Sequence, residues 1–358
     1  MSRLLGIEHI EKMNKKITIL SIDGGGIRGI LPGVILSYIE EQLRTKEGTQ
    51  ARLSDYFDLM AGTSTGGILT CMYVTPGEDG RPKFTATEAV DLYLKNGAKI
   101  FSIPLVRRIL NWFGLFDAKY PVKNIEQILH EKLKDTKLSN ALKPCMVTAY
   151  EIFQRKTVFF NKVDTLKGIT NDYLLRDVAR STSAAPTYFK PARIESTFGA
   201  PLYLVDGGMF ANNPSMCAYA EARTLNFKEI LKRDDKPDYP NATEMLMISI
   251  GTGSQGQPYP YSKARKWGVV GWLVPLIDIL MSGNSETVHY ELDQLFTAVN
   301  PKNKEFYFRL EPTVETAKNA MDLASPENMH ALEEAGKIYV TDHAKLLDQI
   351  VELLIANK

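Results

Sequence analysis

Gly62-Thr63-Ser64-Thr65-Gly66-Gly67 lies between two apolar runs, Tyr56 to Ala61 before it and Ile68 to Val74 after it. This order of patterns predicts a strand, a sharp turn and a helix. A G-x-S-x-G sequence in that setting is typical of a nucleophile elbow, because glycines on either side of the serine let strand and helix approach around a strained seryl backbone. The alternative is an ordinary Gly/Ser/Thr turn at a strand end, and these six residues do not separate the two.

Outward from this turn, short apolar runs alternate with helix-like segments. Strands are also expected at Ile17 to Asp23, Pro144 to Tyr150, Thr157 to Phe160, Tyr203 to Val205, Met245 to Ile250 and Phe306 to Leu310. Helices are expected at Ile30 to Leu43, Ala86 to Lys99, Val122 to Leu133, Leu174 to Ser181, Ser215 to Leu225 and Ala331 to Leu354. The alternation favours an α/β fold, a three-layer α/β/α sandwich with a mostly parallel central sheet. No shift in composition marks a boundary, so residues 1–358 are expected to form a single domain.

The composition excludes several classes of function. Lys and Arg total 43 and Asp and Glu total 42, a formal net charge of +1, so no overall field attracts a nucleic-acid polymer. The three cysteines, Cys71, Cys145 and Cys217, are too few and scattered for a disulfide framework or a metal cluster. The N-terminus lacks the apolar core of a signal peptide, and no run reaches the roughly 18 apolar residues that cross a bilayer. A cytoplasmic protein is therefore expected.

A glycine loop follows the first predicted strand. Gly24, Gly26 and Gly29 have the G-x-G-x-x-G spacing of a dinucleotide-binding turn, between a strand and a helix. An NAD(P)-binding Rossmann protein is therefore an alternative. That interpretation requires an acidic residue at the end of the second strand to hold the ribose, and the Ser64 turn stands there instead.

The same loop is also suited to binding a negative charge. Successive amides at Gly24, Gly25 and Gly26, with that of Thr65 after the serine, would form an oxyanion hole for acyl transfer. Arg28 projects from this loop and would either steady it or attract an anionic headgroup.

A serine hydroxyl needs a neighbouring base to act as a nucleophile. The chain has five histidines: His9, His130, His289, His330 and His343. None of them follows a glycine-rich strand end that would bring it to the elbow. Asp206 does, because it closes the run from Tyr203 to Val205 and precedes Gly207-Gly208. Sites of α/β proteins assemble at the carboxyl ends of strands, so Asp206 is the predicted base, with a pKa that partial burial would raise.

Four motifs stand together in an order found in one known family. They are Asp23-Gly24-Gly25-Gly26-Ile27-Arg28-Gly29, Gly62-Thr63-Ser64-Thr65-Gly66-Gly67, Ser181-Thr182-Ser183-Ala184-Ala185-Pro186-Thr187-Tyr188-Phe189, and Asp206-Gly207-Gly208 with Asn212-Asn213-Pro214. Ser249-Ile250-Gly251-Thr252-Gly253 is similar to a fifth. The chain from about Ile17 to Gly253 therefore resembles the patatin-like phospholipases, and beyond Gly253 the resemblance is thin.

The resemblance implies a hydrolase with a Ser64/Asp206 dyad, without catalytic histidine, calcium, another metal or a cofactor. The expected reaction is the cleavage of fatty acyl esters from membrane glycerophospholipids, of phospholipase A1 or A2 type, through an acyl-enzyme. The layout is similar to bacterial phospholipase effectors of anti-phage systems that cyclic dinucleotides switch on. A cyclic dinucleotide is thus the expected activator, with Lys263 to Lys266 as a phosphate contact. The alternatives are a constitutive lipase of general lipid metabolism and an idle storage protein, although folding alone requires neither Ser64 nor Asp206.

Two segments are apolar and aromatic but too short to span a bilayer. Ile100 to Phe116 includes Trp112 and Phe113, and Trp267 to Met281 follows the cations of Lys263 to Lys266. Either composition suits a peripheral contact with the inner membrane, and one of the two is expected to act as a mobile cap over Ser64. The alternative is that both are core helices or the contacts of a homo-oligomer.

Overall fold

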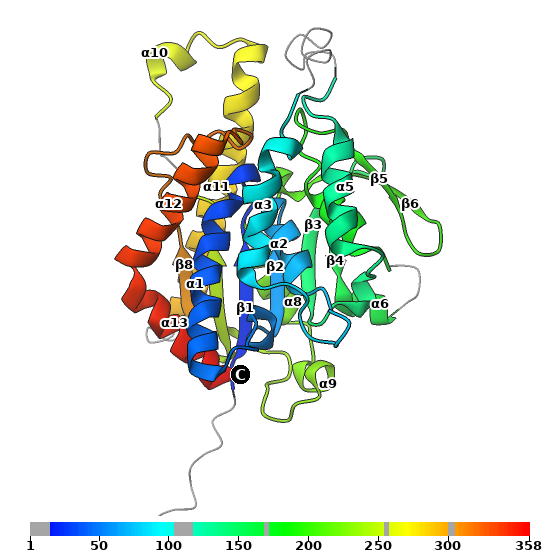
Figure 1. Cartoon of the computed structure of the whole chain (residues 1–358), viewed down its shortest axis with the longest axis vertical. Helices are drawn as coiled ribbons and strands as arrows, with labels where there is room; N and C mark the ends of the chain where they lie inside the picture. The colour runs from blue at the N-terminus through cyan, green and yellow to red at the C-terminus, as the bar shows by residue number, and fades with distance from the viewer. Residues whose placement is uncertain (1–14, 104–116, 168–171, 254–257, 300–304) are drawn as a thin grey trace, which may run out of the picture.

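An eight-stranded sheet runs through the middle of the molecule in the computed structural model, which describes residues 15–103, 117–167, 172–253, 258–299 and 305–358. The strands are β1 (Ile17–Ile22), β2 (Leu59–Gly62), β3 (Cys145–Glu151), β4 (Lys156–Asn161), β5 (Ala192–Glu195), β6 (Pro201–Asp206), β7 (Met245–Ile250) and β8 (Tyr307–Leu310). Their order is β5-β6-β3-β2-β1-β7-β8, with β4 paired to β3. Helices cover both faces of the sheet (Figure 1), so the predicted sandwich is confirmed.

The centre of the sheet is parallel and one edge is antiparallel. β1 pairs in parallel with β2 and β7, β2 with β3, and β7 with β8. β3 pairs antiparallel with β4 and β6, and β5 antiparallel with β6. The seven predicted strands are all present, whereas β5 was not predicted. The mostly parallel sheet is therefore mixed at the edge that carries Asp206.

The helices begin and end at recognisable signals. They are α1 (Ile30–Glu47), α2 (Thr65–Tyr73), α3 (Ala86–Ile100), α5 (Val122–Leu133), α6 (Lys162–Lys167), α7 (Leu175–Thr182), α8 (Ser215–Ala222), α9 (Phe227–Leu231), α10 (Tyr261–Ala264), α11 (Val269–Val299), α12 (Pro326–Asp342) and α13 (Ala344–Asn357). The side chain of Ser325 caps the start of α12, with Pro326 at the first helical position. The single helix predicted from Ala331 to Leu354 was wrong, because the chain leaves helical geometry at His343, between α12 and α13.

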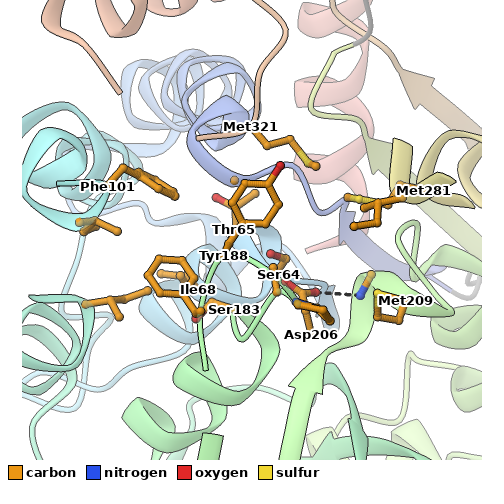
Figure 2. A pocket seen from close by; sticks show the side chains of 18 of the residues that line it. Ser64, Thr65, Ile68, Phe101, Ser183, Tyr188, Asp206, Met209, Met281 and Met321 are labelled. Atoms are coloured by element: carbon orange, nitrogen blue, oxygen red, sulfur yellow. Dashed lines mark hydrogen bonds between the residues drawn. The ribbon is translucent and has the colours of Figure 1, made fainter. Parts of the chain in front are cut away.

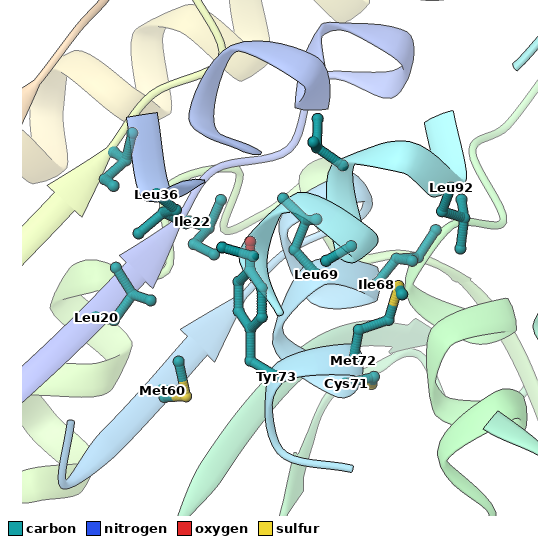
Figure 3. Packing of buried hydrophobic residues seen from close by; sticks show 14 of the residues in the cluster. Leu20, Ile22, Leu36, Met60, Ile68, Leu69, Cys71, Met72, Tyr73 and Leu92 are labelled. Carbon is teal, nitrogen blue, oxygen red and sulfur yellow. The ribbon is translucent and has the colours of Figure 1, made fainter. Parts of the chain in front are cut away.

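Two apolar cores lie on the two faces of the sheet. Leu20 and Ile22 of β1 point into the larger core, which α1, α2, α3, α12 and α13 cover. Ile17 and Ile19 point into the smaller core, which α8 and the second half of α11 cover. Figure 3 shows the larger core where Leu20 and Met60 of neighbouring strands meet the helices. Successive side chains of a strand alternate between faces, so a sheet covered on both sides has continuous apolar strands.

The two apolar segments differ in what the structure describes. Residues 104–116 of the first, with Trp112 and Phe113, lie outside the described residues. The second forms the first half of α11, which extends beyond the end of the sheet together with α10 (Figure 1). Among the described helices, none combines the length and the apolar content that a bilayer span requires.

Candidate active site

Ser64 stands at the turn between β2 and α2, with backbone angles φ 54° and ψ −121°. A positive φ is costly for a serine, so the surrounding structure must hold it. Gly62 and Gly66 make the turn possible: a Cβ on Gly62 would lie 2.2 Å from the carbonyl oxygen of Gly66, and one on Gly66 would lie 2.1 Å from that of Ile22. The strand, the strained turn and the helix of a nucleophile elbow are thus all present.

Two hydrogen bonds from other elements fix this turn. The backbone N–H of Ser64 donates to the hydroxyl oxygen of Thr182, at the end of α7, over 2.8 Å. The Tyr93 hydroxyl on α3 donates to the carbonyl oxygen of Thr65 over 3.0 Å. Thr182 belongs to a motif quoted from the sequence, but its spacing gave no sign of this contact. Its position shows why that motif accompanies the elbow.

Asp206 lies beside Ser64 although its strand runs in an unexpected direction. Asp206 is the last residue of β6, so the expected position at the carboxyl end of a strand is confirmed, but β6 runs antiparallel to β3. Register explains its position instead: Asp206 lies opposite Ala149, close to the level where β3 pairs with the end of β2. The Ser64 hydroxyl acts to lower the pKa of the Asp206 carboxylate, and Figure 2 shows the two side chains next to each other.

Burial sets the proton affinity of this carboxylate. Asp206 is 5% exposed. Burial raises the pKa of Asp206 to about 7, against the opposing effects of the Ser64 hydroxyl and of the 2.8 Å hydrogen bond from the Gly208 N–H. Loss of water disfavours the charged form of a carboxylate, which is the sign seen here. A carboxyl group that titrates near neutral pH can both accept and return a proton.

The glycine loop offers fewer free amides than predicted. The N–H of Gly24 donates to the carbonyl oxygen of Asn212 over 3.0 Å, so Gly24 is not available as an oxyanion donor. At Gly24 the backbone extends from the end of β1 and pairs with the loop that contains Asn212. The N–H groups of Gly25, Gly26 and Thr65 have no acceptor within the described part of the chain. Of these three, Gly26 and Thr65 line the cavity that contains Ser64.

Arg28 stabilises the glycine loop through its side-chain contacts. Its guanidinium is buried and donates to the carbonyl oxygen of Gly253 over 2.8 Å and to the side chain of Asn319. Burial lowers the pKa of Arg28, and nearby acidic groups including Asp278 oppose that effect. Of the two roles expected for Arg28, these contacts fit the one that steadies the loop.

Asp23 and Arg309 form a buried ion pair at the start of the same loop. The guanidinium of Arg309, on β8, donates to both carboxylate oxygens of Asp23 over 3.0 and 2.7 Å. Burial raises the pKa of Asp23, while Arg309 and the Ser285 hydroxyl lower it. Arg309 also donates to the Ser249 hydroxyl oxygen over 2.8 Å, which joins β1, β7 and β8. No pattern in the sequence pointed to Arg309.

The second half of α11 holds the loop that follows Asp206. The Asn284 side chain accepts from the N–H of Asn213 over 3.0 Å and donates to the carbonyl oxygen of Phe210 over 3.0 Å. The Ser285 hydroxyl accepts from the Asn212 side chain over 3.1 Å and donates to Asp23. Asn284 and Ser285 thus fix the Asn212-Asn213 motif, and sequence reasoning did not single them out.

Beside Ser64 lies an apolar cavity of about 770 Å³, counting its open mouth. Its walls come from α2, α3, α5, α11 and the segment after α7, and include Ile68, Phe101, Ile125, Phe189 and Met281. Figure 2 shows several of these side chains around Ser64 and Asp206. A second, more polar cavity adjoins it and shares Tyr188, Ile277, Met281 and Met321.

None of the four histidines that the structure describes lines this cavity. His9 lies outside the described residues. His130, His289, His330 and His343 do not line the cavity that contains Ser64. His289 contacts the Tyr307 hydroxyl and lines only the polar cavity, and His343 stacks on Tyr339. Asp206, by contrast, lines the same cavity as Ser64.

An α/β sandwich with a serine on a strained strand-turn-helix elbow places the chain among the hydrolases that use such a serine. Residues 20–219 match the family described as Patatin-like phospholipase, more than half of the chain, and the chain belongs to that family. Patatin-like protein 1 of Arabidopsis thaliana is 37% identical over 346 residues, covering 91% of this chain and 82% of that protein. Patatin-15 of Solanum tuberosum is 34% identical over 91% of this chain and 84% of its own.

These alignments extend further than the motifs. Each alignment covers 91% of this chain and must therefore include residues beyond Gly253. The expectation that the resemblance is thin beyond Gly253 was wrong. Membership also removes the support for the dinucleotide-binding alternative. A further relative, 35% identical over 91% of this chain and 86% of its own, is named Probable inactive patatin-3-Kuras 1 of Solanum tuberosum. Membership alone therefore does not decide whether a member is active.

Proposed function

We propose that the protein hydrolyses fatty acyl esters of membrane glycerophospholipids with Ser64 as nucleophile and Asp206 as base. The observation that carries this proposal is the position of the Ser64 hydroxyl beside a buried carboxylate whose pKa burial raises to about 7. A base poised near neutral pH suits the removal of a seryl proton. An idle member of the family would need neither the strained elbow nor this pairing.

The reaction follows from the contacts. Asp206 takes the proton of Ser64 as the seryl oxygen bonds to the ester carbonyl carbon, and the carbonyl oxygen becomes an anion. The amides of Gly26 and Thr65, with Gly25 beside them, are the donors proposed for this anion. Asp206 then gives its proton to the departing alcohol of the lysophospholipid. Water releases the fatty acid in the same way, with Asp206 accepting the water proton and returning it to Ser64.

The shape of the site supports a lipid rather than a small ester. The apolar cavity suits an acyl chain, because it presents aliphatic and aromatic side chains next to Ser64. The adjoining cavity has charged walls, including Arg28, Lys119 and Asp278, which suit a polar headgroup. A substrate with an apolar tail and a charged head would occupy both, with its ester near Ser64. Cleavage of either the sn-1 or the sn-2 chain, phospholipase A1 or A2 activity, belongs to this proposal.

Labelling and product analysis test the proposal. A fluorophosphonate should label Ser64, and defined phosphatidylcholines should release free fatty acids detectable by mass spectrometry. Ser64→Ala and Asp206→Asn should each abolish release. Ser183→Ala is the matched control, because Ser183 lines the same cavity but donates to the Arg180 carbonyl oxygen instead of Asp206. Labelling without release from any lipid would contradict the substrate, and no labelling at all would favour an idle protein.

Control by a cyclic dinucleotide in anti-phage defence stays a prediction. The relatives named above are plant proteins whose names state no regulator. Lys263 and Lys266 are exposed, as a phosphate contact requires. Liposome hydrolysis with and without a panel of cyclic dinucleotides measures this directly. Full activity that none of them changes would instead favour a constitutive lipase of general lipid metabolism.

A further inference from the structure

The first half of α11 is apolar and exposed. Val269 is 91% exposed, Val270 76% and Val274 64%. Five more large apolar residues of the same half are exposed: Trp272, Leu273, Leu276, Ile279 and Leu280. Soluble monomers rarely expose a contiguous apolar patch of this kind without a partner for it. We call residues 258–281, which include α10, the apolar arm.

The apolar surface goes round most of this helix. At ~100° per residue, the exposed apolar positions from Val269 to Leu280 cover about 220° of its circumference. A helix that packs against a protein core needs a stripe only about half as wide. The breadth therefore fits immersion in an apolar medium better than a seam with one protein. Trp272 packs edge-on against Trp267, with ring centroids 5.0 Å apart, and tryptophan is enriched where membranes meet water.

Positive charge gathers on the arm. It contains Lys263, Arg265 and Lys266 against a single acidic residue, Asp278, although the whole chain has a net charge of only +1. All three cations are exposed, and none forms an ion pair within the part of the chain that the structure describes. Asp278 accepts a hydrogen bond from the Tyr259 hydroxyl over 2.7 Å. The arm is therefore complementary in charge to anionic lipid headgroups.

The arm ends at the catalytic cavity. Ile277 and Met281, near its end, line the cavity that contains Ser64, and Figure 2 shows Met281 among the residues around the dyad. The next turn of the same helix, at Asn284 and Ser285, is bonded to the loop after Asp206. A surface that binds the arm would therefore lie next to the mouth of the cavity.

We infer that the apolar arm inserts into the interface of an anionic phospholipid bilayer and holds the cavity mouth against it. This inference rests on the proposed function for the identity of the substrate. Membrane binding by the arm can nevertheless be measured without any hydrolysis. The competing occupant of the same surface is a second copy of this chain.

Ether-linked lipids separate binding from hydrolysis, because they contain no acyl ester. The wild-type protein should cosediment with vesicles of ether-linked phosphatidylcholine and phosphatidylglycerol. Replacing Val269, Val270 and Leu273 together by serine should weaken this binding by at least ~10-fold, since three exposed apolar side chains no longer leave water. None of the three lines either cavity, so hydrolysis of a soluble short-chain ester should stay at the wild-type rate.

Two further variants make the test specific. Replacing Leu166, Tyr239 and Ile338 by serine removes exposed apolar residues outside the arm and should leave vesicle binding unchanged. Replacing Lys263, Arg265 and Lys266 by glutamine should weaken binding to the anionic vesicles by ~10-fold or more, with little change on phosphatidylcholine alone.

A spectroscopic measurement is independent of sedimentation. Two of the three tryptophans of the chain, Trp267 and Trp272, belong to the arm. In a Trp112→Phe background, their emission should shift to shorter wavelength when anionic vesicles are added, because indole leaves water. No shift in a protein that binds vesicles would place the contact elsewhere and overturn the inference.

Each of the remaining outcomes decides between membrane binding by the arm and an alternative. Equal vesicle binding by the arm variant and the wild type overturns the inference. If the wild type sediments as a dimer that the arm variant converts to a monomer, and vesicle binding does not change, a second copy covers the arm. Ester hydrolysis without vesicle binding overturns this inference alone, and vesicle binding without ester hydrolysis overturns the proposed function alone.

Discussion

In the proposed mechanism, Asp206 sets the pH range in which Ser64 can react. Burial raises the pKa of Asp206 to about 7, and only its unprotonated form accepts the seryl proton. We expect kcat/KM for a soluble short-chain ester to rise ~10-fold per pH unit below that pKa and to level off above it. Initial rates across the neutral range measure this profile. A midpoint at the ordinary pKa of an aspartate would mean that water reaches Asp206.

The same burial makes Asp206 a destabilising group above its pKa. Its folded-state pKa of about 7 lies above the ordinary value of 3.8, so the folded state binds the proton more tightly. The stabilisation is complete below the ordinary pKa and is lost as the pH rises through the folded one. Asp206→Asn removes this dependence. Relative to wild type, the variant should gain about 2–3 kcal/mol of unfolding free energy between about pH 5 and about pH 8. Urea unfolding at both values measures the gain, and an unchanged difference would contradict it.

Gly26 is the glycine of the loop whose replacement tests the oxyanion donors most directly. Its φ is +61°, and a Cβ there would lie 2.2 Å from the carbonyl oxygen of Met321. Gly26→Ala should displace the amide and lower kcat by ~10²–10³, with little change in KM. Gly283→Ala is the control, because its Cβ would meet nothing within 4 Å. A wild-type kcat for Gly26→Ala would exclude Gly26 as a donor.

Single residues also show how far the sequence could predict the site. Ser64 and Asp206, which the structure brings into one cavity, could be singled out because a nucleophile and its base need particular residue types beside glycines. Gly24 was misassigned, because a glycine pattern does not tell which amides already have acceptors. Asn284, Ser285 and Arg309 were not predictable, because ordinary polar residues gain these roles only when distant elements meet.

At the scale of elements, β8 supports the site from outside the motif-bearing region. Arg309 on β8 and Asp23 at the end of β1 are both buried, so removing one partner leaves an uncompensated charge. Arg309→Met should lower the free energy of unfolding by ~3–5 kcal/mol. Adding Asp23→Asn should recover most of that loss, because the carboxylate that Arg309 had paired with is then neutral too. Urea unfolding of the single and double variants measures the recovery. A double variant as unstable as Arg309→Met would contradict this account.

The helices and strands also differ in how well they could be predicted from the sequence. β1 and β7 were predictable because both are fully buried and mostly apolar. β5 was not, because four residues at the sheet edge, with alternate side chains in solvent, resemble a loop. The direction of β6 could not be deduced either, since pairing partners depend on the connections around the edge. The second half of α11 was missed because its polar residues serve the site rather than the core.

At the scale of the whole molecule, the C-terminal third is part of the same fold as the motifs. Ile350 of α13 is fully buried in the larger core, and Leu292 of α11 is fully buried in the smaller one. α11 also contacts the loop that follows Asp206, and β8 contacts the start of the glycine loop. The single domain expected from the sequence stays a prediction, and the cores that both parts of the chain share support it.

This sharing predicts one cooperative unfolding transition. Ile350→Ala and Leu292→Ala should each lower the free energy of unfolding by ~2–5 kcal/mol, because each leaves a cavity in a core. Ile338→Ala, at an exposed position of α12, should change it by less than about 0.5 kcal/mol. Urea unfolding followed by circular dichroism, tryptophan fluorescence and ester hydrolysis should give coincident midpoints for every variant. If Ile350→Ala separated an early transition that leaves hydrolysis intact, the C-terminal helices would be a unit of their own. Coincident midpoints would instead mean that the Ser64 turn and the C-terminal helices unfold together. A substitution that destabilises α13, which is far from Ser64 in the sequence, would then also lower activity.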